Sequence, residues 1–182
     1  MAKDLVKAAE HYKKFLIEMG HNLNREGLKN TPMRYTKFFN EITTPQEFNF
    51  TTFKNEGMDE MIIQTNIPFT SSCEHHTAIF QGYGSIAYIP SKKIVGLSKL
   101  ARTLDYFSNR LQNQERITKQ VAEFIKEKLN PKGVAVVLTA QHSCMCVRGV
   151  KKHDTWTTTS AMLGCFKNEL NCRQEFLSLI KK

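Results

Sequence analysis

The sequence contains no apolar stretch long enough to cross a membrane. Its longest uninterrupted apolar runs, such as residues 134–138, are far shorter than the ~20 residues that a spanning helix needs. Residues 1–4 lead directly into an amphipathic pattern, so we expect no signal peptide. These two absences argue against an integral membrane protein and predict a cytoplasmic location, where thiols remain reduced.

The cysteines do not make a convincing disulfide framework. There are five of them in 182 residues, and an odd number leaves at least one without a partner. Together with the expected cytoplasmic location, this favours metal binding or catalysis as the role of at least some of them.

Acidic residues are scarce relative to basic ones, with 17 Asp and Glu against 26 Lys and Arg and a formal net charge of +9. Such an excess serves solubility or attracts an anionic partner, which can be nucleic acid, a membrane surface or a phosphorylated small molecule. Composition alone does not choose among these. The basic residues are dispersed, however, with no block of five or more, and this weakens the polybasic tails typical of nucleic-acid and membrane binding.

The length and apolar content of the sequence are sufficient for one domain with a hydrophobic core. Apolar residues make up 41% of the chain, and no repeat, low-complexity tract or linker divides its catalytic part. Residues 5–19 have helical spacing and end at Gly20, and Thr31 with Pro32 begins a second helix that runs to about Ile42. Residues 43–57 have the composition of a connector. We expect residues 1–50 to form an N-terminal helical arm and residues 51–182 the catalytic domain.

Strands and a pair of helices are predicted after the connector. One helix begins at Ser98 and presents an apolar face that includes Leu111, the next covers residues 117–129, and Asn171 caps a last helix. The segments with strand-like patterns are residues 61–67, 78–89, 133–140 and 155–160, with residues 143–150 as a hairpin partner. Strands, then a helix pair, then strands again predict an α+β fold with an antiparallel sheet.

Two short motifs carry the residue types of a zinc site. Cys73 and His76 lie three residues apart in CEHH, and Cys144 follows in His142-Ser143-Cys144. A catalytic zinc uses three protein ligands and a water, and Cys73, His76 and Cys144 would supply two thiolates and one imidazole. His75 and His142 flank these ligands, and histidine can move protons near neutral pH.

The same residues also allow a closed zinc site that only braces the fold. Such a site needs a fourth ligand, which Cys146 or a histidine could provide. Cys146 lies two residues after Cys144, so on a regular strand both side chains would point the same way. Cys146 is therefore the residue that competes with this ligand set.

Seven segments in a fixed order make the chain resemble GTP cyclohydrolase I from about Glu26 to the last helix. They read EGLKNTPMRYTKFF, CEHH, GLSKLAR, QNQERIT, GVAVV, QHSCMCVRGV and TTTSAMLGCF. The resemblance implies the tunnelling fold, an antiparallel sheet with a helix pair on one face, whose subunit sheets assemble into a barrel. It further implies a homo-oligomer, typically a decamer, with active sites between subunits. The implied reaction converts GTP and water to 7,8-dihydroneopterin triphosphate and formate.

The resemblance also assigns roles to individual residues. Cys73, His76 and Cys144 match its Zn²⁺ ligands, and His142 and His75 match its catalytic histidines. Glu115 matches the acid that recognises guanine, with Gln114 beside it. The residues that match contacts to the triphosphate are Ser98, Lys99, Arg102 and Arg148, and Arg34 and Lys37 match basic residues from a neighbouring subunit.

Two other functions are weighed against this one. A non-catalytic basic zinc protein that binds nucleic acid would need a basic stripe with aromatic residues and a closed metal site. The basic residues here lie inside the motifs instead, so we expect neither nucleic acid nor membrane as a partner. A pterin synthase or nitrile reductase of the same fold is disfavoured by the joint presence of CEHH, QHSC and QER.

Overall fold

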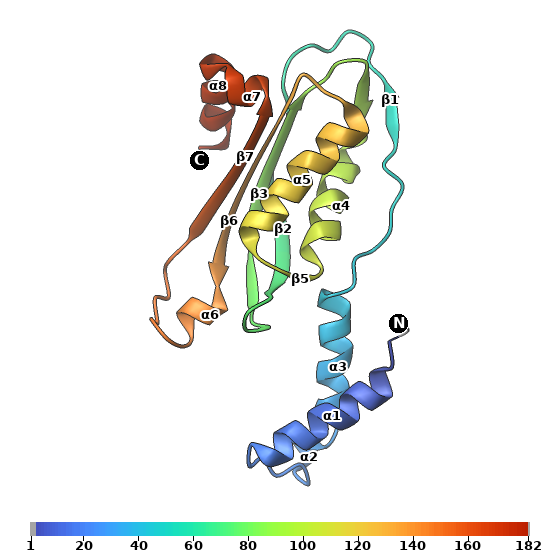
Figure 1. The fold of residues 1–182 in the computed structure, drawn as a ribbon, viewed down its shortest axis with the longest axis vertical. Coiled ribbons are helices and arrows are strands. Elements are labelled where there is room, and N and C mark those ends of the chain that lie inside the picture. Colours follow the sequence, from blue (N-terminus) through green and yellow to red (C-terminus); the bar gives the residue numbers. More distant parts are fainter. Residues whose placement is uncertain (1–2, 182) are drawn as a thin grey trace. The chain divides into compact units, whose positions relative to one another are not determined.

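The computed structural model describes residues 3–181 and divides the chain into a first unit that ends at Thr44 and a second that begins at Pro45. The first unit contains α1 (Leu5–Glu18), α2 (Glu26–Lys29) and α3 (Thr31–Ile42) (Figure 1). Asp4 caps α1 by accepting a hydrogen bond from the Lys7 backbone N–H. The rings of Tyr12 and Tyr35 stack with centroids 4.1 Å apart, which joins α1 to α3.

The second unit is built on a five-stranded sheet in the order β5-β2-β3-β6-β7. Every neighbouring pair is antiparallel except β2 with β5. The strands are β2 (Ile62–Cys73), β3 (Ile79–Ile89), β5 (Leu111–Gln112), β6 (Gly133–His142) and β7 (Thr157–Gly164), and β1 (Thr52–Lys54) pairs with β4 (Lys93–Val95) apart from them. The helices are α4 (Leu97–Ser108), α5 (Gln114–Leu129), α6 (Ser143–Cys146), α7 (Cys165–Asn168) and α8 (Leu170–Ile180).

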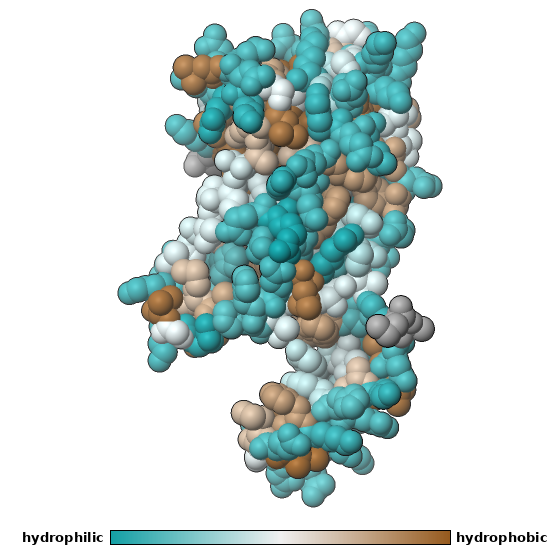
Figure 2. Space-filling view, viewed as in Figure 1, coloured by the Kyte–Doolittle hydropathy of each residue, from teal (hydrophilic) through white to brown (hydrophobic). Residues whose placement is uncertain are grey.

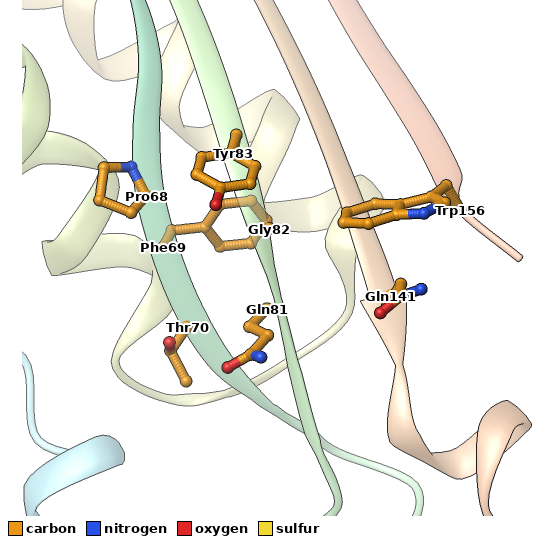
Figure 3. A pocket seen from close by; sticks show the side chains of 8 residues that line it. All are labelled: Pro68, Phe69, Thr70, Gln81, Gly82, Tyr83, Gln141 and Trp156. Carbon is orange, nitrogen blue, oxygen red and sulfur yellow. The ribbon is translucent and has the colours of Figure 1, made fainter. Parts of the chain in front are cut away.

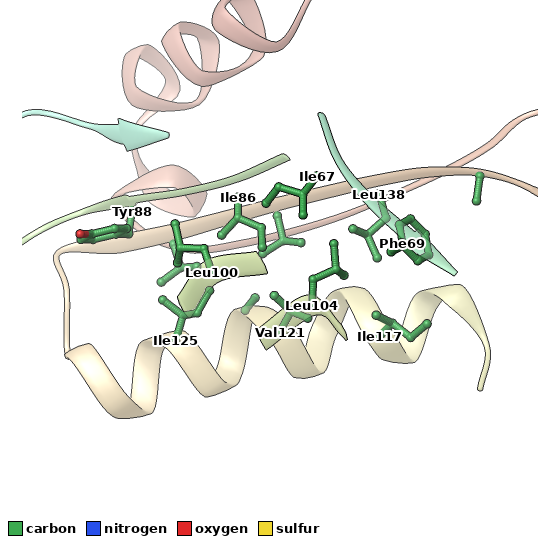
Figure 4. Packing of buried hydrophobic residues seen from close by; sticks show 14 of the residues in the cluster. Ile67, Phe69, Ile86, Tyr88, Leu100, Leu104, Ile117, Val121, Ile125 and Leu138 are labelled. Carbon is green, nitrogen blue, oxygen red and sulfur yellow. The ribbon is translucent and has the colours of Figure 1, made fainter. Parts of the chain in front are cut away.

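The main core lies between the sheet and the helix pair α4–α5, which lie side by side on one face (Figure 1). Apolar side chains of both helices point at the sheet in Figure 4; they include Leu100, Leu104, Ile117, Val121 and Ile125, opposite Ile67, Ile86 and Leu138. Each fully buried side chain of this size contributes about 1.5–3 kcal/mol to stability. The outer face of α5 carries charged residues and forms hydrophilic surface in Figure 2.

A second, smaller core lies on the opposite face of the sheet. Successive residues of a strand point to opposite faces, and Ala87 of β3 packs with α7 and α8 while its neighbours Ile86 and Tyr88 pack with α4 and α5. Phe166 of α7 and Phe176 of α8 are fully buried there. The sheet is therefore covered by helices on both faces, with the larger cover from α4 and α5.

The structure confirms the predicted α+β class with a helix pair on one face of a largely antiparallel sheet, an arrangement consistent with the tunnelling fold. Two segments differ. Leu111, predicted on a helical face, lies in β5 beside Ser72. Residues 143–150 do not form a hairpin strand, because β6 continues to His142 and no turn residues separate it from Ser143. The chain instead forms the short helix α6.

The last helix begins at Leu170, with Glu169 at its cap position, rather than at the predicted cap Asn171. This difference is within the usual uncertainty of a helix end. No helix in residues 3–181 combines the length and apolar character needed to span a bilayer.

Candidate metal centre and active site

Cys73, His76 and Cys144 converge at one end of the sheet. Cys73 is the last residue of β2, His76 lies in the turn that leads to β3, and Cys144 is on α6. One ligand atom from each lies within 4.8 Å of the other two, and the Cys73 Sγ to His76 Nδ1 distance is 3.9 Å. A tetrahedral zinc with bonds of about 2.0–2.3 Å would separate its ligand atoms by about 3.5–3.8 Å, so this donor set fits zinc.

Backbone hydrogen bonds hold the turn that carries the first two of these residues. The Cys73 N–H donates to Ala78 O at 2.8 Å, and the N–H groups of Thr77 and His76 donate to Cys73 O at 2.8 and 3.3 Å. Thr77 has a φ of +52°, a left-handed conformation that a β-branched residue rarely adopts. The turn is therefore a defined loop that holds strained backbone beside the metal group.

Cys146 lies outside this group. Because α6 is helical, residues 144 and 146 are about 200° apart around its axis, whereas on a strand they would share a face. The Cys146 Sγ lies 3.6 Å from the carbonyl oxygen of His153. Among the described residues, the three-ligand group does not include Cys146. The predicted competition from Cys146 depended on the strand that the structure replaces with a helix.

His142 ends β6 two residues before Cys144, and its ring is held on two sides. It stacks on Phe80 with centroids 4.5 Å apart and planes 7° apart. Its Nε2 lies 2.8 Å from Oε1 of Gln114. Burial lowers the pKa of His142 below its usual value, and the nearby Glu115 carboxylate opposes this shift. Burial of the ring therefore favours its uncharged form.

His75 also lies near the metal group. Its Nδ1 is 3.6 Å from Cys73 Sγ, and its Nε2 is 4.0 Å from a carboxylate oxygen of Glu74. The side chain is exposed, so a ligand could reach it from solvent. His75 thus lies in the loop that carries Cys73 and His76, whereas His142 ends β6 two residues before Cys144.

Glu74 ties the metal loop to the first turn of α5. The Arg116 guanidinium donates to both carboxylate oxygens of Glu74 at 2.6 and 2.9 Å, and Asn113 donates to one of them at 3.1 Å. The hydrogen bonds to Arg116 lower the pKa of Glu74, which keeps it ionised. Asn113 also caps α5 by accepting from the Arg116 backbone N–H. Sequence reasoning missed this pair, although both residues lie within quoted motifs.

Glu115 and Gln114 are neighbours in the first turn of α5 with different surroundings. Glu115 is exposed and close enough to His142 to influence its charge. Gln114 is buried, and its amide is engaged with this chain through Leu138, Thr157 and His142. Glu115 can therefore accept hydrogen bonds from a ligand, whereas Gln114 faces inward.

The residues predicted to contact the triphosphate lie on different elements of the structure. Arg148 lies beside the metal group, with its Nη2 3.1 Å from His76 Nε2. Ser98 and Lys99 lie in the first turn of α4, whereas Ser108, at the other end of that helix, accepts a hydrogen bond from Ser71 of β2. Ten residues of helix separate the two ends by about 15 Å. Within one copy of the chain, Ser98 and Lys99 therefore lie at the opposite end of α4 from the contact with β2, the strand that ends at Cys73.

Arg102 lies one turn after Ser98 and Lys99 on α4. Lys99 and Arg102 line an open cavity of about 440 Å³ with Glu47, Phe48 and Asn49. Burial raises the pKa of Asp105, one turn further along, and Arg102 opposes that shift. Arg34 and Lys37 lie on α3 in the first unit. This cavity thus has the cationic lining that a phosphate would need.

Another cavity, of about 250 Å³, opens on the sheet face opposite α4 (Figure 3). Tyr83 and Trp156 line it, each about half exposed, together with Gln81 and Gln141. It contains none of the residues predicted to act in catalysis, metal binding or substrate binding.

Comparison with known proteins agrees with the resemblance found in the sequence. The family model described as GTP cyclohydrolase I matches residues 8–181. A Coxiella burnetii protein named GTP cyclohydrolase 1 is 47% identical over 180 residues, covering 96% of this chain and 97% of that protein. Proteins of the same name from Sulfurihydrogenibium and Aquifex aeolicus are each 44% identical, covering 99% and 100% of this chain and 97% and 99% of their own lengths.

Proposed function

The chain belongs to the GTP cyclohydrolase I family and is an enzyme of that family, and from this premise we propose that it converts GTP and water to 7,8-dihydroneopterin triphosphate and formate with a bound zinc ion. The observation that carries the proposal is the convergence of Cys73, His76 and Cys144 next to His142. This arrangement combines a donor set for zinc with an imidazole, two residues from Cys144, that can move a proton.

We propose that Cys73, His76 and Cys144 hold the zinc, which would supply Lewis-acid activation of a water. As water adds to C8 of guanine, His142 takes up the proton that this water loses and passes it to the imidazole ring of the base, and the ring opens. A second hydrolytic step releases C8 as formate, and the ribose then rearranges and closes onto the freed amine. Exposed His75 is positioned to exchange the protons that these steps require.

Glu115 would select the base. A carboxylate can accept two N–H groups from the edge of guanine, and adenine lacks that donor pair. The exposure of Glu115 and its effect on His142 support a place for the base between these two residues. Exchange of GTP for ATP should therefore abolish turnover.

The triphosphate would be held by cations from more than one copy of the chain. Arg148 is beside the metal group of its own chain, whereas Ser98 and Lys99 are at the end of α4 that lies about 15 Å from Ser108, the residue that contacts Ser71 of β2. We propose that Ser98, Lys99 and Arg102 of one copy serve the metal centre of another. Arg34 and Lys37 would add charge from a neighbouring subunit, with residues 1–50 acting as its helical arm.

Assembly of several copies follows from this division of the site. We propose a homo-oligomer in which the sheets join into a barrel, with a decamer as the expected size. A cytoplasmic location is part of the proposal, supported by five free cysteines, which suit a reducing compartment. Nucleic acid and membrane are not proposed as partners.

The test measures formate and dihydropterin absorbance after incubation with GTP, with and without a chelator. We expect turnover to stop with the chelator and to return with added zinc. Cys144→Ser should lose the metal and the activity, whereas the matched change Cys146→Ser, two residues along α6, should keep both. A Cys144→Ser protein with one zinc per chain and full formate release would refute the ligand set.

A further inference from the structure

Gln114 forms a buried hydrogen-bond network whose direction can be worked out atom by atom. Its side chain is almost fully buried at the start of α5. Its Nε2 donates to the carbonyl oxygens of Leu138 and Thr157, each at 3.0 Å, and lies 3.1 Å from Thr159 Oγ1. Carbonyl oxygens can only accept, so the NH₂ side of the amide must face them.

Two threonine hydroxyls fix the same orientation independently. Thr118 Oγ1 donates to the backbone oxygen of Gln114 at 2.7 Å and lies 2.6 Å from Thr159 Oγ1. Since the only hydroxyl proton of Thr118 is used, Thr159 must donate to Thr118. Thr159 Oγ1 can then only accept from Gln114, which again requires Nε2 on that side. The amide oxygen of Gln114 is left to face His142.

This orientation determines which nitrogen of His142 carries the proton. Oε1 of Gln114 can only accept, so His142 Nε2, 2.8 Å away, must be the donor. We infer that Gln114 is a positioning residue that fixes a proton on Nε2 of His142 and leaves Nδ1 as the nitrogen available to the substrate. The catalytic half of this inference rests on the proposed function.

Two further observations agree with a fixed ring. Phe80 stacks on the imidazole at 4.5 Å, so the ring cannot turn without losing that contact. Within the described residues, no hydrogen bond involves His142 Nδ1. Gln114 was grouped with Glu115 at the guanine by resemblance. Its burial and its full set of internal partners instead place it behind the histidine.

The tautomer can be measured without GTP. The zinc-loaded protein, labelled with ¹⁵N-histidine, would be studied by solid-state NMR, with the His142 signals assigned by their loss in His142→Asn. We expect the protonated nitrogen of His142 to be Nε2 and the unprotonated one to be Nδ1. A proton on Nδ1 of neutral His142 would overturn the inference, whatever the enzyme does with GTP.

Kinetics separate positioning from substrate contact. Gln114→Met has similar volume but replaces the amide oxygen with a thioether, which is only a weak acceptor. We therefore expect a mixture of His142 tautomers and a kcat lowered about 10- to 100-fold, less than the ~10²–10⁴ of a general acid–base group itself. KM for GTP should change by no more than about two-fold, because a residue behind His142 makes no contact with the bound substrate that the substitution could remove. A raised KM with unchanged kcat would instead place Gln114 on the substrate and refute the positioning role.

A milder variant tests the same network if Gln114→Met does not fold. Thr159→Val removes one acceptor of the Gln114 amide and keeps the two carbonyls, so the Nε2–H tautomer should persist. Loss of the Nε2–H tautomer of His142 in Thr159→Val would show that the hydrogen bonds to the two carbonyls do not hold the Gln114 amide. If His142 has the Nε2–H tautomer in a protein that releases no formate from GTP, the proposed function is refuted and the orientation of Gln114 is still supported.

Discussion

The hydroxyl of Tyr88 joins the sheet to the start of α4, and its removal gives a quantitative test of the structure. Tyr88 lies near the end of β3 and is fully buried in the main core. Its hydroxyl oxygen accepts a hydrogen bond from the backbone N–H of Val95 at 3.1 Å. Val95 ends β4 and is followed within two residues by α4, which carries Ser98 and Lys99.

We predict that Tyr88→Phe destabilises the protein by about 1–3 kcal/mol, because it leaves the buried N–H of Val95 without a partner. The apolar contacts of the ring remain, so little is lost beyond that bond. Tyr83→Phe is the matched control: its side chain is about half exposed and makes no hydrogen bond within the described residues. We expect that control to lie within about 0.5 kcal/mol of the parent.

Urea unfolding at one fixed protein concentration would measure both variants, since an oligomer's stability depends on concentration. A Tyr88→Phe protein as stable as Tyr83→Phe would refute the claim that this hydroxyl satisfies a buried donor. A looser junction between β4 and α4 should also raise KM for GTP, with zinc content unchanged. Loss of zinc in Tyr88→Phe would show that the change spreads beyond that junction.

The pH dependence provides a second check on Tyr88. Burial raises the pKa of Tyr88 above its ordinary value, and the bond from Val95 opposes this. A raised folded pKa means that the contribution to stability is complete below the unfolded pKa of ~10 and is lost as pH rises through the folded value. The stability difference between the parent and Tyr88→Phe should therefore narrow above pH ~10. A difference that stays constant there would contradict the burial of the phenol.

Three further predictions concern backbone and thiol positions. In Gly82→Ala the new Cβ would overlap the backbone oxygen of Thr139 on β6, so we expect the free energy of unfolding to fall by at least ~4 kcal/mol, or the protein not to fold. A Cβ at Gly27 would have no atom within 4 Å, so the control Gly27→Ala should unfold at the parental urea concentration or higher. Thr77→Gly should be about 1 kcal/mol more stable than Thr77→Ala in the same assay, because only glycine is unstrained at a φ of +52°; the opposite order would count against the left-handed turn. Burial and a neighbouring thiol raise the pKa of Cys172 to about 12, so iodoacetamide at pH 8 should label it, by mass spectrometry, only after unfolding.

The parts of the site that depend on short sequence separations could be predicted from the sequence. Cys73 and His76 lie three residues apart, so a single tight turn brings both to one place whatever the remainder of the chain does. The Cys146 alternative rested on a strand at residues 143–150, where the structure has the helix α6. Whether residues 144 and 146 share a face depends entirely on local conformation, and a helical turn and a strand give opposite answers.

The triphosphate residues show a different limit of sequence reasoning. Motif order places Lys99 and Arg148 at one ligand, but it does not say whether they reach it from the same chain. The length of α4 shows that Lys99 lies at the opposite end of that helix from its contact with Ser71. Motif order therefore identifies candidate residues for one ligand, but not whether one copy of the chain supplies them all.

The first turn of α5 connects the separate parts of the site. Successive helical residues point about 100° apart, so three consecutive side chains leave in three directions. Gln114 points into the core and holds His142, while Arg116 reaches back to Glu74 in the metal loop. Glu115, between them, is left exposed to a ligand. The distances from the metal loop to the histidine and to the proposed guanine contact are thus set by one helical turn. A shift of α5 would move all three together, which explains why the residues on either side of Glu115 are fixed by several hydrogen bonds each.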